Sequence, residues 1–239
     1  MAVQHSYGKI VTDGLVLSLD ASDRNSYVSG SATWRDLAGT NNGTLTNGPT
    51  FSSAGNASSI VFDGVDDYSS QTYRGLPNGL TLNSWIKTTS SKSTKNYDGN
   101  ASNNIIGDTT GTVWIGFGVT NGKVNYNNAK KTGEWSTSQY YSTASVNDGS
   151  WKYITVTHDK TTELVNLYIN GILDSIYNNS STGIYDQWSY TAFNTLCRGY
   201  LNSDYFNGTI GIVQIYNRTL TPTEILQNYN AQKSRFGLT

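Results

Sequence analysis

Short runs in which apolar and polar residues alternate, separated by breaks rich in Gly and Asn, constrain this chain more than any other feature of its sequence. In the run GLVLSLD, residues 14–20, Leu15, Leu17 and Leu19 point one way and the residues between them point the other. Because successive side chains of a strand lie on opposite faces of a sheet, the run predicts a half-buried β-strand. Further strands are predicted at 80–88, 112–119, 151–159, 164–172 and 209–217. With weaker candidates they make roughly a dozen short strands, the number expected of a two-sheet antiparallel jelly-roll sandwich.

The composition agrees with an all-β fold and argues against nucleic acid as a partner. Glutamate, a good helix former, occurs only at Glu134, Glu163 and Glu224, while Tyr and Thr, which suit a pleated and half-buried surface, are abundant. Only 14% of residues are charged and the formal net charge is −1. Because no basic field is present to attract phosphates, nucleic acid is not an expected partner.

The C-terminal segment, about 221–234, is the one place where the sequence predicts a helix. Thr221 stands as the N-cap, Pro222 takes the first helical position, and Glu224 completes a capping box. Gly237 falls where a helix stop belongs. The predicted architecture is therefore a β-sandwich with one short helix at its C-terminal end.

Turn and loop signals complete the outline. Asn170-Gly171 predicts a tight β-hairpin turn between two strands. The polar stretches 89–104 and 128–149 lack a core pattern and predict long loops of the kind that carry function. Because no linker, repeat or shift in composition interrupts the chain, residues 1–239 are expected to form a single jelly-roll domain.

The cysteine count and the N-terminal residues bear on where the chain folds. Cys197 is the only cysteine, which rules out an internal disulfide and a cysteine-based zinc site. The start, MAVQHSYGKIV, lacks the charged n-region and the long apolar h-region of a secretory signal. No apolar stretch approaches the roughly 20 residues that a membrane span needs. We therefore expect a chain that folds in a cytosol and does not insert into a membrane.

The stretch IVFDGVDDYSS, residues 60–70, concentrates three aspartates at one strand end. Asp63-Gly64 is a turn dipeptide, since aspartate bonds its own backbone in turns, and on this interpretation the acids only solvate the link between two strands. The alternative is a calcium site, in which Asp66 and Asp67 supply part of the oxygen ligands that a hard cation prefers. Calcium is the only cofactor that the sequence suggests, and both interpretations stay open.

Catalytic arrangements find little support in the sequence. Glycoside hydrolysis needs two carboxyl groups about 5–10 Å apart. Lectin-like glucanases pair their glutamates as Glu-x-Asp-x-x-Glu, whereas each glutamate here stands alone. His158 ends a predicted strand beside Asp159, but no Gly-x-Ser-x-Gly elbow accompanies it, and a histidine in that position is more often structural. We therefore predict that the protein is not an enzyme.

Aromatic residues are abundant, with 6 Trp and 17 Tyr, and several stand in polar stretches. An aromatic ring stacks on the C–H face of a sugar while neighbouring polar groups bond the hydroxyls, and the same residue types anchor protein interfaces. The candidates for a carbohydrate- or partner-binding site are Trp135, Trp188, Tyr190 and Tyr97. The other tryptophans, expected to fill the sandwich, are Trp34, Trp85, Trp114 and Trp151.

Several segments together resemble the laminin-G-like, concanavalin A-like jelly-roll modules, in that family's order and over nearly the whole chain: GLVLSLDASDRNSY, SIVFDGVDDY, LTLNSWIKT, DGSWKYITVTHDKTTELVNLYING and FNGTIGIVQIYNRTLTPTEILQNYNAQKSRFGL. The resemblance implies a carbohydrate- or protein-binding rim, with calcium there in many members. It gives Asp63 and Gly64 a role in the fold and leaves Asp66 and Asp67 as candidate metal ligands. Many members carry an acidic residue where this chain has Gly211, which weakens the calcium hypothesis.

The chain is also similar to structural proteins of tailed bacteriophages, notably marine and cyanobacterial ones, in the segments NNGTLTNGPTF and NYNAQKSRFGL. This resemblance implies a virion protein, a capsid decoration, capsid fibre or tail fibre, that stabilises the particle, attaches it to host-surface glycans, or both. The expected partners are other virion proteins and further copies of the chain, since virion positions are symmetric. Such a protein is made in the host cytoplasm, which reconciles a lectin-like fold with the lack of an export signal. The alternative is a free carbohydrate-binding module of a bacterial surface or secreted glycan-active protein.

Overall fold

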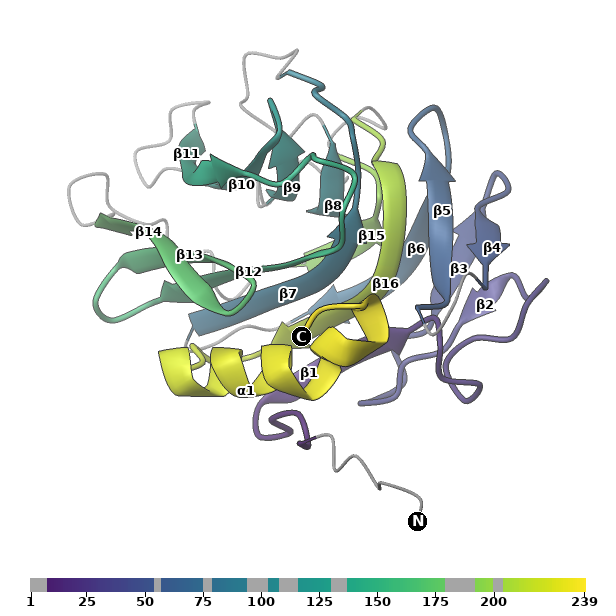
Figure 1. Ribbon diagram of the computed structural model, residues 1–239, viewed down its shortest axis with the longest axis horizontal. Helices are drawn as coiled ribbons and strands as arrows, with labels where there is room; N and C mark the ends of the chain where they lie inside the picture. The colour runs from purple at the N-terminus through teal and green to yellow at the C-terminus, as the bar shows by residue number, and fades with distance from the viewer. Residues whose placement is uncertain are drawn as a thin grey trace.

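Two antiparallel β-sheets face each other in this protein, and one short helix lies across the outside of the first sheet (Figure 1). In the part of the chain that is described, each sheet has eight strands, which confirms the predicted two-sheet sandwich with a C-terminal helix. The computed structural model describes residues 8–53, 57–74, 79–93, 103–107, 116–129, 137–178, 192–199 and 204–239.

The first sheet is organised around β16. One edge of β16 pairs with β7, while β5 and β1 share its other edge. The strands follow one another in space as β14 (Ile172–Asn178), β13 (Leu164–Ile169), β12 (Lys152–Asp159), β7 (Gly79–Lys87), β16 (Asn207–Tyr216), β5 (Ser59–Asp63) and β4 (Thr50–Ser52), with β1 (Leu15–Asp20) also on β16.

The second sheet contains the remaining described strands. Its order is β11 (Thr137–Ser145), β10 (Lys123–Ala129), β9 (Gly116–Thr120), β8 (Asn104–Gly107), β15 (Ala192–Leu196), β6 (Tyr68–Arg74), β3 (Gly43–Thr46) and β2 (Thr33–Trp34). Because β5 belongs to the first sheet and β6 to the second, the turn between them crosses from one sheet to the other.

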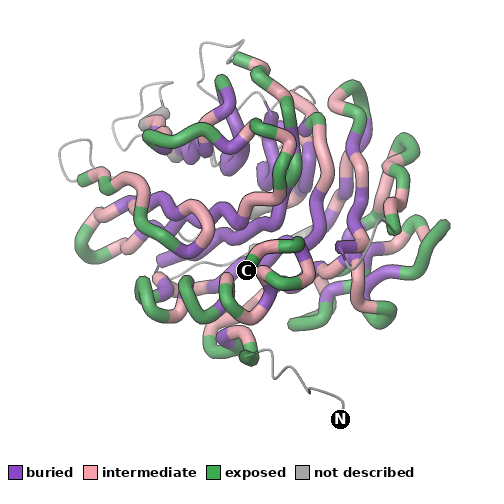
Figure 2. Tube along the Cα trace, viewed as in Figure 1, coloured by how far each residue is buried: buried purple, intermediate pink, exposed green. Residues whose placement is uncertain are grey.

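The core between the sheets is made by alternate residues that face inward. Leu82 on β7 and Val156 on β12 are fully buried there, and Phe117 on β9 with Val124 on β10 cover them from the second sheet. Figure 2 shows the buried residues concentrated along the central strands. Each fully buried side chain of this size contributes roughly 1.5–3 kcal/mol to stability. Alternation in the sequence therefore gives the sandwich its interior.

The outer face of the first sheet is buried as well, because the C-terminal segment lies across it (Figure 1). Helix α1 spans Pro222–Gln232, and a 3-10 helix continues over Lys233–Phe236. The indole of Trp85 stacks on the ring of Phe236 with centroids 4.1 Å apart, and its Nε1–H donates to Gln232 Oε1 at 2.8 Å. The first sheet therefore has a core on each side.

The tryptophans expected in the interior occupy both cores. Trp34 is fully buried between the sheets and Trp85 is fully buried under the C-terminal segment. Trp151 is partly buried and packs beside Phe236, with ring centroids 4.8 Å apart. Trp114 lies outside the described residues.

Helix α1 begins as the sequence predicts. The Thr221 side chain accepts the N–H of Glu224, and the Glu224 carboxylate accepts the N–H of Thr221, so the capping box is complete. Arg218, which the sequence pattern did not single out, donates to both carboxylate oxygens of Glu224 at 3.0 and 2.6 Å. This pairing lowers the pKa of Glu224 to about 2. Gly237, with φ of 76°, ends the 3-10 helix in the left-handed conformation.

A β-bulge interrupts the alternation predicted for residues 14–20. Leu17 and Leu19 face the core between the sheets, as expected. Leu15 instead joins the outer core, while Val16 packs against the inner one. The pairing with β16 shifts by one residue between Leu15 and Leu17, and such a shift turns every preceding side chain to the opposite face. The prediction that the three leucines share one face was wrong at Leu15.

The turn and loop predictions had mixed outcomes. Asn170 and Gly171 have φ values of 52° and 78° and connect β13 to β14, which confirms the predicted hairpin. The stretch 128–149 was predicted as a loop but contains the nine-residue strand β11. Tyr140 of β11 reaches the core and stacks near Tyr126, whereas the strand's other residues are mostly polar. One inward aromatic among polar residues is too weak a signal for a strand.

His158 is structural, as its position at a strand end suggested. Its ring is buried and its Nδ1 lies 3.0 Å from the hydroxyl of Tyr126. Burial lowers the pKa of His158 to about 3, so the imidazole is neutral at physiological pH. In the described part of the chain, no helix has both the length and the apolar character to cross a membrane.

The absence of a side chain at Gly211 makes room for Phe236 on the first sheet. A Cβ at this position would lie 2.6 Å from Cε1 and 2.8 Å from Cζ of the Phe236 ring. We expect Gly211→Ala to lower the free energy of unfolding by about 1–3 kcal/mol through overpacking. Phe236→Ala should cost about 3–5 kcal/mol.

The double variant should lose less stability than the sum of the two single losses, because removing the ring frees the space that the new methyl needs. Urea unfolding of the four proteins measures this coupling. Strictly additive losses would contradict the packing of Phe236 against Gly211.

Candidate functional site

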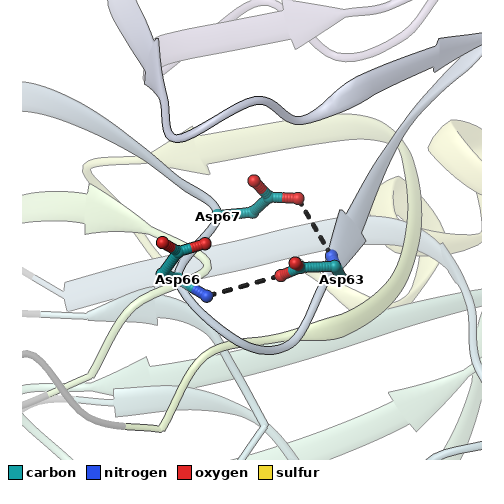
Figure 3. Close-up of side chains that lie close together, drawn as sticks. All are labelled: Asp63, Asp66 and Asp67. Atoms are coloured by element: carbon teal, nitrogen blue, oxygen red, sulfur yellow. Dashed lines mark hydrogen bonds between the residues drawn. The ribbon is translucent and has the colours of Figure 1, made fainter.

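The turn between β5 and β6 brings three aspartates together at one end of the sandwich. Asp63 ends β5, and Asp66 and Asp67 precede β6 (Figure 3). Asp63 and Asp66 are exposed, whereas Asp67 is only 4% exposed. Two of the three carboxylates are therefore accessible to a ligand, and the third is buried.

Hydrogen bonds inside the turn fix its shape. The Asp63 carboxylate accepts the N–H of Val65 at 2.8 Å and that of Asp66 at 3.4 Å (Figure 3 draws the second). The Asp67 carboxylate in turn accepts the N–H of Asp63 at 3.1 Å. Gly64 has φ of 76°, a conformation in which glycine is not strained. The turn interpretation of Asp63-Gly64 is thus confirmed, and the remaining carboxylate oxygens decide whether a second role is possible.

Lys92 supplies a positive charge to the turn from a segment that follows β7. Its Nζ donates to the carbonyl of Gly64 at 2.7 Å and to that of Tyr205 at 3.0 Å. These two carbonyls belong to different parts of the chain, so one ammonium group ties the turn to the residues before β16. No local pattern in the sequence marks Lys92 for this role.

Two asparagines hold the turn from other directions. Asn207, the first residue of β16, donates through Nδ2 to the carbonyl of Asp63 at 2.8 Å. Asn47 donates to the carbonyl of Asp66 at 2.9 Å. A Cβ on Gly64 would lie 2.5 Å from the Cβ of Asn207, so the close contact itself requires glycine. We call residues 63–67 together with Lys92, Tyr205 and Asn207 the acidic rim.

The carboxylates of the acidic rim differ in how readily they ionise. The backbone N–H of Val65 holds the pKa of Asp63 below its usual value, and the charge of Lys92 acts in the same direction. Burial raises the pKa of Asp67, and the negative charges of Asp63 and Asp66 add to this effect. The rim therefore combines a carboxylate that is stabilised as an anion with one that is crowded by like charge.

The three carboxylates can hold a metal ion. Each offers one oxygen, and these oxygens lie within 4.8 Å of one another. Ligands on opposite sides of a calcium ion are about 5 Å apart, since each Ca–O distance is about 2.3–2.6 Å. The donor set of Asp63, Asp66 and Asp67 therefore fits a hard cation. The sequence assigned Asp63 a role in the fold and named Asp66 and Asp67 as candidate ligands, and this geometry adds Asp63 as a third candidate.

Among the described acids, Asp67 and the two glutamates are poorly placed for glycoside hydrolysis. Asp67 has a raised pKa, as a general acid requires, but it is buried behind the backbone of Asp63. Glu224 is ionised and held by Arg218 in the helix cap, and Glu163 lies in the turn between β12 and β13. Glu134 lies outside the described residues.

The aromatic residues predicted to bind a sugar or a partner lie outside the described residues. These are Trp135, Trp188, Tyr190 and Tyr97. Of the predicted site residues, the structure describes Asp66 and Asp67 and brings them together with Asp63, Lys92 and Asn207.

We expect Asp67→Asn to raise the melting temperature at pH 7. The amide oxygen keeps an acceptor for the N–H of Asp63 and removes a charge that is buried beside two other carboxylates. Because the pKa of Asp67 is higher in the folded than in the unfolded state, the ionised form destabilises the fold, and protonation at low pH relieves the cost. The gain in melting temperature should therefore shrink as the pH falls and disappear below pH ~4.

Thermal unfolding between pH 3.5 and 8 measures this dependence. Asp63→Asn is the matched comparison and should lower the melting temperature at pH 7, because the pKa of Asp63 is shifted in the opposite direction. A gain from Asp67→Asn that persists unchanged at pH 3.5 would contradict the electrostatic explanation.

Several solved structures share this fold. The binding domain of Paraclostridial Mosquitocidal Protein 1 matches with a TM-score of 0.67 and 16% identity, over 95% of this chain and 56% of that one. The botulinum neurotoxin serotype D binding domain gives 0.66 and 13%, over 93% and 53%. A structure of botulinum neurotoxin type C gives 0.64 and 14%, over 92% and 52%. The chain thus spans about half the length of these proteins, and identities this low show the fold alone.

A family model gives the more specific assignment. Residues 55–226, which include the β5–β6 turn and most strands of both sheets, match the model described as the concanavalin A-like lectin/glucanases superfamily. A search of curated protein sequences finds no match. The strand order, the two facing sheets and this match agree, and the chain belongs to the concanavalin A-like lectin/glucanases superfamily, in its laminin-G-like branch.

Proposed function

We propose that this protein is a non-enzymatic, lectin-type module that binds carbohydrate. The observation that carries the proposal is the acidic rim. Two backbone N–H groups of the turn orient the exposed carboxylate of Asp63, and asparagines of separate segments hold the backbone carbonyls of Asp63 and of the exposed Asp66. Both carboxylates offer acceptors for sugar hydroxyls, and the one of Asp63, oriented by its turn, loses little side-chain entropy on binding.

Other groups of the acidic rim suit a sugar as well. Lys92 contributes an ammonium group, which carbonyls of two separate segments hold in place. Tyr205, whose carbonyl accepts one of these bonds, is half-buried and is an aromatic residue of the rim. A small number of fixed polar groups next to an aromatic residue is the usual make-up of a site that orients a polar ligand.

The similar structures support binding without showing its ligand. They are binding domains of toxins, and the cell entry of botulinum neurotoxin type C depends upon interaction with two ganglioside molecules. Gangliosides present sugars at a cell surface. The likeness to these domains favours a surface-binding module. Because this chain corresponds to only about half of each toxin domain, the likeness does not identify the sugar.

The non-enzymatic part of the proposal rests on the carboxyl groups. The superfamily includes glucanases, so the fold is compatible with hydrolysis. In the described residues, however, the carboxyl group with the raised pKa, Asp67, is too deeply buried to protonate a glycosidic oxygen.

Binding is tested by titrating the purified protein against a panel of neutral and acidic oligosaccharides. Asp66→Asn should weaken binding about tenfold, because a hydrogen bond to a charged acceptor is stronger than one to an amide. Asp13→Asn, an exposed aspartate near Arg218 beyond the other end of β16, makes the same change in charge and should leave binding unaltered. Trp135→Ala and Trp188→Ala are expected to weaken binding too, as the sequence predicts.

Two results would count against this function. Equal affinities of the wild type and Asp66→Asn would remove the acidic rim from the site. Release of reducing ends from any bound oligosaccharide would show that the module is an enzyme.

We also propose calcium as the ion that fits the three carboxylates. Because Lys92 already balances part of their charge, the affinity should lie near the weak end for calcium sites, with a dissociation constant of ~1 mM. At ~10 mM calcium the folded state should then gain roughly 1.4 kcal/mol, which raises the melting temperature by a few degrees. Asp66→Asn should abolish this gain, and magnesium at the same concentration serves as the control. A melting temperature that changes neither on addition of calcium nor on addition of a chelator would exclude a structural ion at these carboxylates.

Placement on a virion stays a proposal that rests on the sequence resemblance alone. The same holds for capsid or tail proteins as partners, for assembly as a homo-oligomer and for synthesis in a host cytoplasm. Repetition of weak glycan sites on a particle would raise avidity, so a virion protein and a lectin-type module are compatible roles.

A further inference from the structure

The guanidinium group of Arg198 lies over the ring of Tyr68 at the edge of the acidic rim. The guanidinium carbon is 3.7 Å from the centroid of the Tyr68 ring, at the start of β6. The backbone of Arg198 is held by the hydroxyl of Thr195, which donates to its carbonyl at 2.9 Å. Stacking and this bond give the guanidinium group a defined orientation before any ligand arrives.

No carboxylate pairs with Arg198 among the described residues, although it is partly buried. The other arginines of comparable burial, Arg218 and Arg235, each form an ion pair with an acid, Glu224 and Asp20 respectively. The Nε–H of Arg198 is buried and has no hydrogen-bond acceptor. A buried donor on a charged group is costly when it stays unpaired. Because this Nε–H is itself buried, an anionic ligand would pair with the rest of the guanidinium group and offset part of that cost.

The position of Arg198 relates it to the acidic rim. Its stacking partner Tyr68 follows Asp67 directly and stands two residues from the exposed Asp66. The preceding residue, Cys197, is buried near Asp67, whose charge adds to the effect of burial in raising the pKa of the thiol. The carbonyl of Cys197 accepts the N–H of Phe206, which follows Tyr205 of the rim. Arg198 therefore extends the same surface with a charge of opposite sign.

We propose that Arg198, stacked on Tyr68, is a subsite for the carboxylate of an acidic sugar, an inference that rests on the proposed carbohydrate-binding function. A guanidinium group binds a carboxylate through two parallel N–H bonds, and its planar fork suits this group better than a lysine would. Neutral hydroxyls of the same ligand face Asp63 and Asp66. A second negative group placed at those aspartates would be repelled, so the preferred ligand carries one carboxylate and several hydroxyls.

The test compares, by calorimetric titration, two ligands of nearly the same shape and a third that lacks the acidic sugar. They are 3′-sialyllactose, its methyl ester, in which the carboxylate is neutralised, and lactose. The wild-type protein should bind sialyllactose at least tenfold more tightly than the ester. Arg198→Met, which keeps the packing on Tyr68 but removes the charge, should abolish that preference and leave binding of lactose unchanged.

Further variants separate a ligand-binding role from a structural one. Arg198→Lys should keep less than half of the preference for sialyllactose over its ester, measured as a difference in binding free energy. The lysine ammonium is a point charge and cannot form the two parallel bonds of a guanidinium group. Arg24→Met makes the same change in net charge at an exposed arginine and should alter nothing. A glucuronate-terminated disaccharide, bound with the same dependence on Arg198, would extend the ligand class from sialic to uronic acids.

The outcomes distinguish the two proposals. Equal affinity for sialyllactose and its ester would overturn the Arg198 subsite and leave the carbohydrate-binding function standing. Retention of the preference by Arg198→Met would likewise overturn the subsite alone. A protein that binds none of the ligands, nor any sugar of the wider panel, would overturn both.

Discussion

The stacking of Phe236 on Trp85 gives the first sheet a second buried face, and the placement of the other elements depends on it. One face of β7 and β16 lies against the second sheet, and the other lies under the C-terminal segment. Arg235 adds two hydrogen bonds of 2.7 Å to the carboxylate of Asp20 on β1. The end of the chain is thereby fastened to its first strand, and β16 is held from both sides.

A strand fixed in this way can position a site at its end. Asn207 begins β16, and its N–H donates to the side chain of Asn103 at 2.6 Å while its own amide donates to the carbonyl of Asp63. The acidic rim is therefore joined to the rigid first sheet through β16 and to the second sheet through β8, which Asn103 precedes. Loops that carry function in lectin-like sandwiches need this support, since a ligand gains affinity from groups that are already in place.

The turn that precedes Tyr68 carries exposed carboxylates, whereas the group that lies over its ring is a cation. The carboxylates of Asp63 and Asp66 lie in the turn before it, with the ammonium group of Lys92 beside them, and the guanidinium group of Arg198 lies on the ring itself. On the proposed function, a surface of this kind would discriminate among sugars by the placement of charge, which apolar stacking alone cannot achieve. The net charge of −1 conceals this local separation.

The sequence by itself determined the features that depend on neighbouring residues. Period-two alternation specified most strands, Asn170-Gly171 specified a hairpin, and Thr221 with Glu224 specified the start of the helix, because backbone conformation and capping are settled within a few residues. It also pointed to Asp66 and Asp67. Only the tertiary structure decided the bulge that turns Leu15 outward, the strand β11 and the partners of the acidic rim. Asn207 meets Asp63 across 144 positions of the chain, and Lys92 meets Gly64 across 28. Contacts of this range follow from strand register and from the packing of both faces of a sheet, and no local pattern encodes either.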